Sequence, residues 1–209
     1  MAVVFSSIPA GANGTALASI VPAVGTNFSN EATALATKEV QSAELYTVPT
    51  ASFDVGMVSC NTAAAVGNKM KTSATIRFGA TAANSFHGVM TNYDGGGNSY
   101  HVETNQYAGP GLVLKRRAAG AQTDLATYTW TPANNTSYTL SLENDGTGNL
   151  IVKLDGATVL TFNDTANNRT GGRGALRCEQ SGTTVPMAFF SNIVVDNLTL
   201  AKTVPPYFF

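Results

Sequence analysis

The sequence contains acidic residues whose spacing could support cleavage of a sugar bond. Glycoside hydrolysis needs two carboxylates that flank the scissile bond, and Glu143 and Asp145 are the nearest such pair. Asp145 is followed at once by Gly146, and an Asp-Gly dipeptide is typical of a hairpin turn. We therefore interpret Glu143 and Asp145 as the end of a strand and its turn.

The two histidines, His87 and His101, are the only imidazoles available for acid–base chemistry. His101 and Glu103 are two residues apart and share one face of a strand, so they could act together as a general base. A lyase would also need a tyrosine such as Tyr93 or Tyr100, and Tyr100 points to the opposite face. We interpret His101 and Glu103 as a satisfied polar pair. No GxSxG, HExxH or Walker motif is present, and we predict that the protein is not an enzyme.

An aromatic pair beside an amide-rich turn has the composition of a sugar-binding patch. Tyr128 and Trp130 share a strand face, and Asn134 and Asn135 follow just beyond. Aromatic platforms with nearby amides suit glycan binding, but aromatic residues also dominate the cores of sandwiches. A core aromatic pair is the stronger interpretation, and the glycan-binding patch is the alternative.

The charge balance points away from nucleic acid and from membrane surfaces. The chain of 209 residues has 12 basic and 13 acidic residues, which gives a net charge of −1. The basic cluster from Lys115 to Arg117 is interpreted as a solvated strand end, with a phosphate or acidic-partner contact as the alternative. Cys60 and Cys178 are interpreted as buried free thiols, with a disulfide between them as the alternative. We predict no nucleic-acid partner and no membrane partner.

The elements that position these residues are strands. Tyr138 to Phe162 contains three apolar runs separated by Asp-Gly turns, which predicts an antiparallel meander. Further strands are predicted at Phe53–Cys60, Lys71–Phe78, Phe86–Tyr93, Ser99–Glu103, Gly111–Arg117, Leu125–Trp130, Ala175–Glu179, Met187–Ser191 and Ile193–Leu200. This pattern predicts an all-β fold, an antiparallel β-sandwich of the jelly-roll type with little helix. Glu31 to Leu45 is predicted to be a loop with one helical turn.

We predict one sandwich domain with a segment at each end. Residues 50–202 form the β-sandwich, residues 1–49 an N-terminal arm that could add a strand, and residues 203–209 an aromatic tail. Exposed aromatic residues at a chain end are a liability in a monomer. We therefore predict a homo-oligomer whose ends bind partners, through Phe5, Val204, Tyr207, Phe208 and Phe209. The first residues make a poor secretory signal, and no apolar run is long enough to span a membrane.

Four segments resemble the concanavalin A-like (laminin-G-like) jelly-roll modules found in bacteriophage and bacterial proteins. They are the hairpin from Phe86 to Glu103, the meander from Tyr138 to Phe162, the closing strand from Asp196 to Leu200 and the opening segment from Gly14 to Phe28. The glycanases of this fold carry Glu-x-Asp-x-Glu on one strand face, and here Thr147 stands in place of the third acid. Many relatives bind calcium, which implies Asp196 as a candidate ligand; no other cofactor is expected.

The resemblance leaves several functional classes open, because this fold serves lectins, glycanases, adhesins and virion proteins. We predict a virion structural protein, most specifically a bacteriophage capsid decoration (cement) protein that clamps neighbouring shell subunits through its termini. Its partners would be the major capsid protein or other virion subunits, and its location the virion, assembled in the host cytoplasm. The alternative is a carbohydrate-binding or host-receptor-binding module that contacts surface glycans, such as a tail or fibre component or a lectin.

Overall fold

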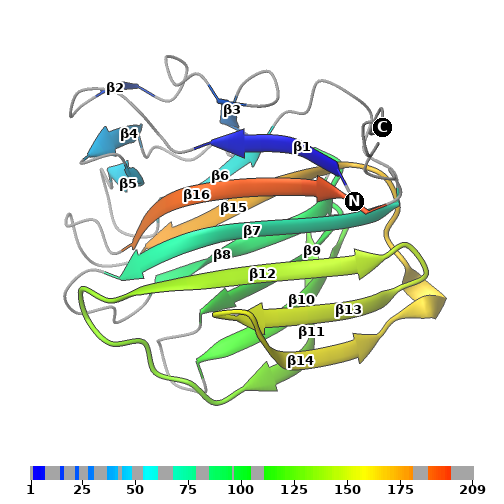
Figure 1. Cartoon of the computed structure of the whole chain (residues 1–209). Coiled ribbons are helices and arrows are strands. Elements are labelled where there is room, and N and C mark those ends of the chain that lie inside the picture. The colour runs from blue at the N-terminus through cyan, green and yellow to red at the C-terminus, as the bar shows by residue number, and fades with distance from the viewer. Residues whose placement is uncertain are drawn as a thin grey trace, which may run out of the picture.

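Two antiparallel sheets pack face to face and enclose the core (Figure 1). The computed structural model describes residues 2–7, 15–16, 22–23, 28–30, 37–41, 44–48, 54–60, 68–78, 85–95, 97–104, 111–180 and 188–198. Before residue 61 the side chains that it describes are those of Pro22, Ala23 and Glu44. The predicted all-β sandwich is confirmed, since the one helical segment of the described residues is the short 3-10 helix η2 (Thr165–Asn167). No helix in this part of the chain is long and apolar enough to cross a membrane.

The larger sheet, sheet A, has nine strands in the order β14-β13-β12-β7-β16-β5-β4-β2, and β1 also pairs with β16. Its strands are β1 (Ala2–Ser7), β2 (Thr15–Ala16), β4 (Thr37–Gln41), β5 (Glu44–Val48), β7 (Lys69–Phe78), β12 (Ser137–Asp145), β13 (Asn149–Leu154), β14 (Ala157–Asn163) and β16 (Ala188–Asn197). Sheet B has seven strands in the order β11-β10-β9-β8-β15-β6-β3. They are β3 (Phe28–Asn30), β6 (Asp54–Cys60), β8 (Ser85–Tyr93), β9 (Ser99–Thr104), β10 (Leu112–Ala118), β11 (Ala121–Tyr128) and β15 (Arg173–Gln180).

Strict alternation along β7 shows how the sequence builds the core. Every second residue from Met70 to Phe78 is buried, and the residues between them are partly exposed. The period of two directs the buried set toward sheet B. Gly174 of β15 permits the close approach of the two sheets, because a Cβ there would lie 2.3 Å from Val195 Cγ2 and 2.7 Å from Thr72 Oγ1.

The predicted meander forms β12, β13 and β14 in sheet A. Its second turn uses Asp155 and Gly156, whose φ angles of 49° and 83° suit a two-residue hairpin loop. The Asp155 carboxylate also accepts a hydrogen bond of 2.7 Å from the Thr139 amide. The first turn is closed by Asp145, whose side chain accepts hydrogen bonds from Thr147 and Asn149.

Two sequence predictions about local structure were wrong. Within the segment from Glu31 to Leu45, expected to be a loop with one helical turn, the described residues instead belong to β4 and β5, which pair with each other. The two strands expected on either side of Asn192 are one strand, β16. Asn192 has a φ of 47°, and the register shifts between Ser191 and Val194, so this residue forms a bulge inside the strand.

The segment predicted to be an N-terminal arm contributes strands to both sheets. β1 pairs with β16, β2 with β4, β4 with β5, β5 with β16 and β3 with β6. Phe5 lies opposite Val195 in this pairing. The tail residues Val204, Tyr207, Phe208 and Phe209 lie outside the described residues, so their predicted partner contacts stay a prediction.

The register of β6 and β15 bears on the two cysteines. Cys60 pairs with Gly174, whereas Cys178 pairs with Gly56. Four positions along a strand separate the two pairs, which is about 13 Å. A disulfide needs Cα atoms within about 7 Å, so this register excludes a direct bond between Cys60 and Cys178.

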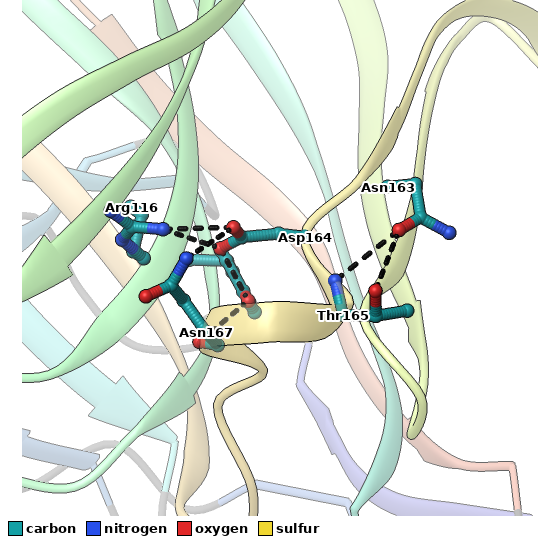
Figure 2. A network of polar contacts seen from close by, with 6 residues as sticks. Arg116, Asn163, Asp164, Thr165 and Asn167 are labelled. Atoms are coloured by element: carbon teal, nitrogen blue, oxygen red, sulfur yellow. Dashed lines mark hydrogen bonds and ion pairs between the residues drawn. The ribbon is translucent and has the colours of Figure 1, made fainter.

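A buried carboxylate joins the two sheets at one end of the core (Figure 2). Asp164 follows β14 of sheet A and is 6% exposed. Arg116 of β10 donates hydrogen bonds of 2.8 and 3.0 Å to its two oxygens. The hydroxyl of Tyr100, on β9, donates to Asp164 Oδ2 at 2.9 Å, and Asn167 Nδ2 donates to Oδ1 at 3.1 Å. Burial and this hydrogen bond raise the pKa of Tyr100 above its usual value.

His87 lies on the core side of β8 and is fully enclosed. It is 1% exposed, its ring meets Phe190 edge-on at 6.5 Å, and neither ring nitrogen has a hydrogen-bond partner among the described residues. Burial, and to a smaller extent Arg177, lower the pKa of His87 from 6.5 to about 3. The folded protein therefore keeps this imidazole neutral at pH values where the unfolded chain binds a proton.

This difference predicts acid destabilisation. The stability that depends on neutral His87 is fully present above about pH 6.5 and is lost as the pH falls toward about 3, at up to about 1.4 kcal/mol per pH unit. We expect His87→Leu to reduce the loss of unfolding free energy between about pH 7 and about pH 4.5 by about 2 kcal/mol. Urea unfolding at both pH values measures it, and parallel losses in wild type and variant would contradict it.

Candidate functional site

The inner strand β9 of sheet B is buried on both of its faces. All six of its residues are buried. Tyr100 and Val102 point into the core, so alternation directs His101 and Glu103 to the outer face of sheet B, the face turned away from sheet A. Both of these polar residues have no exposed surface. Two ionisable side chains are therefore buried outside the apolar core.

Glu103 is the centre of a group of charged residues contributed by three strands. Its Oε1 lies 2.8 Å from Lys115 Nζ of β10, and its Oε2 forms an ion pair with Arg177 Nε of β15. His101 Nε2 is 3.8 Å from Glu103 Oε2. We call Glu103, His101, Lys115 and Arg177 the sheet-B charge cluster.

The pairing register explains why these residues meet. Lys115 lies opposite His101, and Gly88 of β8 lies between Glu103 and Arg177 in the register. Gly88 has no side chain to separate them. A Cβ at this position would lie 1.8 Å from the Val102 carbonyl oxygen and 2.8 Å from Glu103 Cα. Glycine is thus required for the close approach of β8 and β9 beside Glu103.

Burial and the neighbouring positive charges keep His101 uncharged. Burial is the main effect that lowers its pKa well below 6.5, and the charges of Arg177, Lys115 and Arg117 act in the same direction. Gln122 acts on the pKa of His101 in the opposite direction. At neutral pH the site therefore combines a neutral imidazole, one buried carboxylate and several cations.

The cluster opens toward the edge strand β11. The Lys115 side chain is 14% exposed, and that of Asp124, on β11, is 64% exposed. These two residues are paired in the register, with Lys115 Nζ 3.6 Å from Asp124 Oδ1. Arg117 and Gln122 are the next pair along the same face. This edge offers cationic donors and carboxylate and amide acceptors to a ligand rich in oxygen atoms.

The predicted aromatic patch lies elsewhere, at the end of β11. Tyr128 and Trp130 are partly buried and pack against the core. The Trp130 ring meets Phe78 at 5.8 Å and Tyr138 at 4.8 Å, both edge-on. Asn134 and Asn135 are exposed in the following turn. The core aromatic pair and the glycan-binding patch therefore both stay predictions. What the structure adds is the contact of Trp130 with Phe78 and Tyr138.

The other acids singled out from the sequence have neighbours of their own. Glu143 binds Lys153 at 3.0 Å. Asp145 is held by turn hydrogen bonds, which lower its pKa to about 2 against an opposing effect of burial. Asp196, the candidate calcium ligand, lies 3.9 Å from the Lys71 ammonium. No group of three or more His, Cys, Asp or Glu residues that could hold a metal ion is found in the described part of the chain.

Sequence reasoning did not find the sheet-B charge cluster. His101 and Glu103 were interpreted as a self-sufficient polar pair, and the basic run from Lys115 to Arg117 as a solvated strand end. The available signal was that two neighbouring strands each place ionisable residues two apart, His101 with Glu103 and Lys115 with Arg117. Arg177 had no local signal, because only the pairing of β15 with β8 brings it to Glu103.

Comparisons with known proteins relate the chain to others by fold. No protein-family model matches it, and no curated protein matches it. The carbohydrate binding module CBM66 from Bacillus subtilis is similar, with a TM-score of 0.63 and 14% identity over 90% of this chain and 99% of that one. A Bacillus subtilis protein of unknown function with a galectin-like fold has a TM-score of 0.61 and 10% identity, covering 81% and 89% of the two chains.

A third similar structure is the metal-free carbohydrate recognition domain of Emp46p. Its TM-score is 0.59 at 8% identity, and the match covers 88% of this chain and 95% of that one. These identities show a shared fold alone. The resemblance to jelly-roll sandwiches is confirmed at that level, and none of the three structures is described as a phage protein.

The buried position of Glu103 predicts a large effect of removing its charge. We expect Glu103→Gln to lower the unfolding free energy by about 3 kcal/mol or more, because it leaves two cations without their shared buried partner. The matched control is Glu143→Gln, which removes a partly exposed pair and should cost about 1 kcal/mol or less. Urea unfolding of both variants measures the difference. Equal losses would show that Glu103 is not held as a buried ion-pair centre.

Proposed function

We propose that the protein is a carbohydrate-binding module that uses the outer face of sheet B. The observation that carries this proposal is the sheet-B charge cluster, with Glu103 and His101 fully buried outside the core. Burying charges is expensive, and well-packed apolar residues would often stabilise a fold equally well. Charged groups retained at such a position are candidates for function.

The similar structures favour a sugar as the ligand. Two of the three are described as a carbohydrate binding module and a carbohydrate recognition domain. The described residues support the same ligand chemistry, because sugar hydroxyls both donate and accept hydrogen bonds. Lys115, Arg117 and Gln122 would contact the ligand at the open edge. Glu103, which is itself paired with Arg177, would hold Lys115 in place from below.

The proposed module binds its ligand without cleaving it. Tyr100 points into the core and bonds Asp164, so it is not on the same face as His101. Glu143 and Asp145 are engaged with Lys153 and with their own turn. These two acids are thus engaged within the protein, whereas glycoside cleavage requires a pair of carboxylates free to flank the sugar bond.

The predicted virion role stays a prediction. It depends on the terminal residues, and residues 203–209 lie outside the described part of the chain. The pairing of β1 with β16 engages Ala2 to Ser7 in the chain's own sheet. Phe5 would therefore have to leave this pairing before β1 could pair with a strand of a neighbouring subunit. A capsid protein partner has no support among the similar structures, whereas contact with surface glycans fits them.

A glycan array tests the proposal directly. We expect binding to at least one oligosaccharide, and a loss of about tenfold in affinity for Arg117→Ala or Gln122→Ala, which each remove one polar contact at the open edge. Thr161→Ala, on the outer face of sheet A, is the control and should bind like wild type.

The same array distinguishes the two candidate sugar sites. Asn134→Ala removes an exposed amide beside Trp130 and should leave binding unchanged. Binding that is lost in Asn134→Ala but kept in Arg117→Ala would move the site to the aromatic patch. Wild-type protein that binds no glycan would overturn the proposed function.

A further inference from the structure

Lys115 lies between two carboxylates of very different character. Glu103 is fully buried and 2.8 Å from the ammonium, while the side chain of Asp124 is 64% exposed and 3.6 Å away. The buried contact is fixed by the sheet and shared with Arg177. The exposed contact is of the kind that contributes little, about 0–1 kcal/mol. A ligand that reaches Lys115 would therefore displace Asp124 and leave Glu103 in place.

The surroundings of Lys115 favour an anionic group at that position. Arg117 lies two residues further along the same face, and its charge, like those of Lys115 and Arg177, acts on His101. Lys115 Nζ also lies 5.8 Å from the centre of the Phe86 ring, so an aromatic face supports the ammonium. The side chain is thus held from two sides and turned toward the edge strand.

The ligand class follows if the proposed function is correct, since this inference rests on it. We propose that the bound carbohydrate carries a carboxylate, as uronic and sialic acids do, and that this carboxylate replaces Asp124 beside Lys115. The exposed aspartate is then a competing counter-ion that occupies the site in the free protein. Guanidinium groups such as that of Arg117 are suited to bind a second carboxylate oxygen.

Paired ligands that differ in charge test the inference. Trigalacturonate is compared with its methyl ester, and 3′-sialyllactose with lactose, by calorimetric titration at low salt. We expect one acidic member to bind about tenfold or more tightly than its neutral partner, which corresponds to about 1.4 kcal/mol. Its affinity should fall as salt is raised to about 0.5 M. The two pairs distinguish a uronate within a chain from a terminal sialic acid.

Two substitutions have opposite expected effects. Asp124→Asn removes the competing carboxylate and should tighten binding of the acidic ligand about threefold. Lys115→Met removes the cation, keeps an apolar stem and should weaken acidic binding about tenfold or more. Lys153→Met on sheet A is the control and should leave it unchanged. Asp124 is exposed, so its variant decides the question even where Lys115→Met does not fold.

The outcomes separate the inference from the proposed function. Neutral sugars that bind as well as acidic ones would overturn the inference and leave the proposed function standing. Weaker acidic binding in Asp124→Asn would show that Asp124 contacts the ligand, which also overturns the inference. Protein that binds neither acidic nor neutral sugars would overturn both.

Discussion

The strand β9 must be buried on both faces, and the rest of the structure depends on this constraint. It lies between β8 and β10 near the middle of sheet B. Alternation sends Tyr100 into the sandwich, where its hydroxyl and Arg116 bind Asp164 of the opposite sheet. The same alternation sends His101 and Glu103 outward into a second buried layer. One short strand thus ties the sheets together on one side and holds the charge cluster on the other.

The two buried carboxylates, Asp164 and Glu103, differ in what they do for the fold. Asp164 is surrounded by donors from nearby residues, and its role in joining the sheets accounts for its burial. Glu103 joins neighbouring strands that backbone hydrogen bonds already connect, so its ion pairs are not what brings these strands together. Its ion pairs instead fix the position of Lys115 at the accessible edge. This contrast is the physical reason for assigning function to the outer face and structure to the interior.

Local patterns in the sequence predicted the fold well. The meander with its Asp155-Gly156 turn, the strands of sheet B other than β3, and the opposite directions of Tyr100 and His101 all follow from period-two alternation and turn chemistry. The site could be predicted only in part. His101 and Glu103 were identified, but Lys115 and Arg177 reach them through the register of distant strands, which no local pattern reveals. β4 and β5 were missed because the segment from Glu31 to Leu45 is rich in Ala, Glu and Lys and so has helical composition, which pairing within sheet A overrides.

The central claim is that the outer face of sheet B, at its β10–β11 edge, is the ligand-binding face. Nuclear magnetic resonance titration of labelled protein with a carbohydrate that binds on the array tests it most directly. The account predicts that the largest shifts fall on Lys115, Arg117, Gln122 and Asp124, with a change in the ring signals of His101 beneath them. Shifts confined to Trp130, Asn134 and Asn135, or spread over the outer face of sheet A, would contradict it.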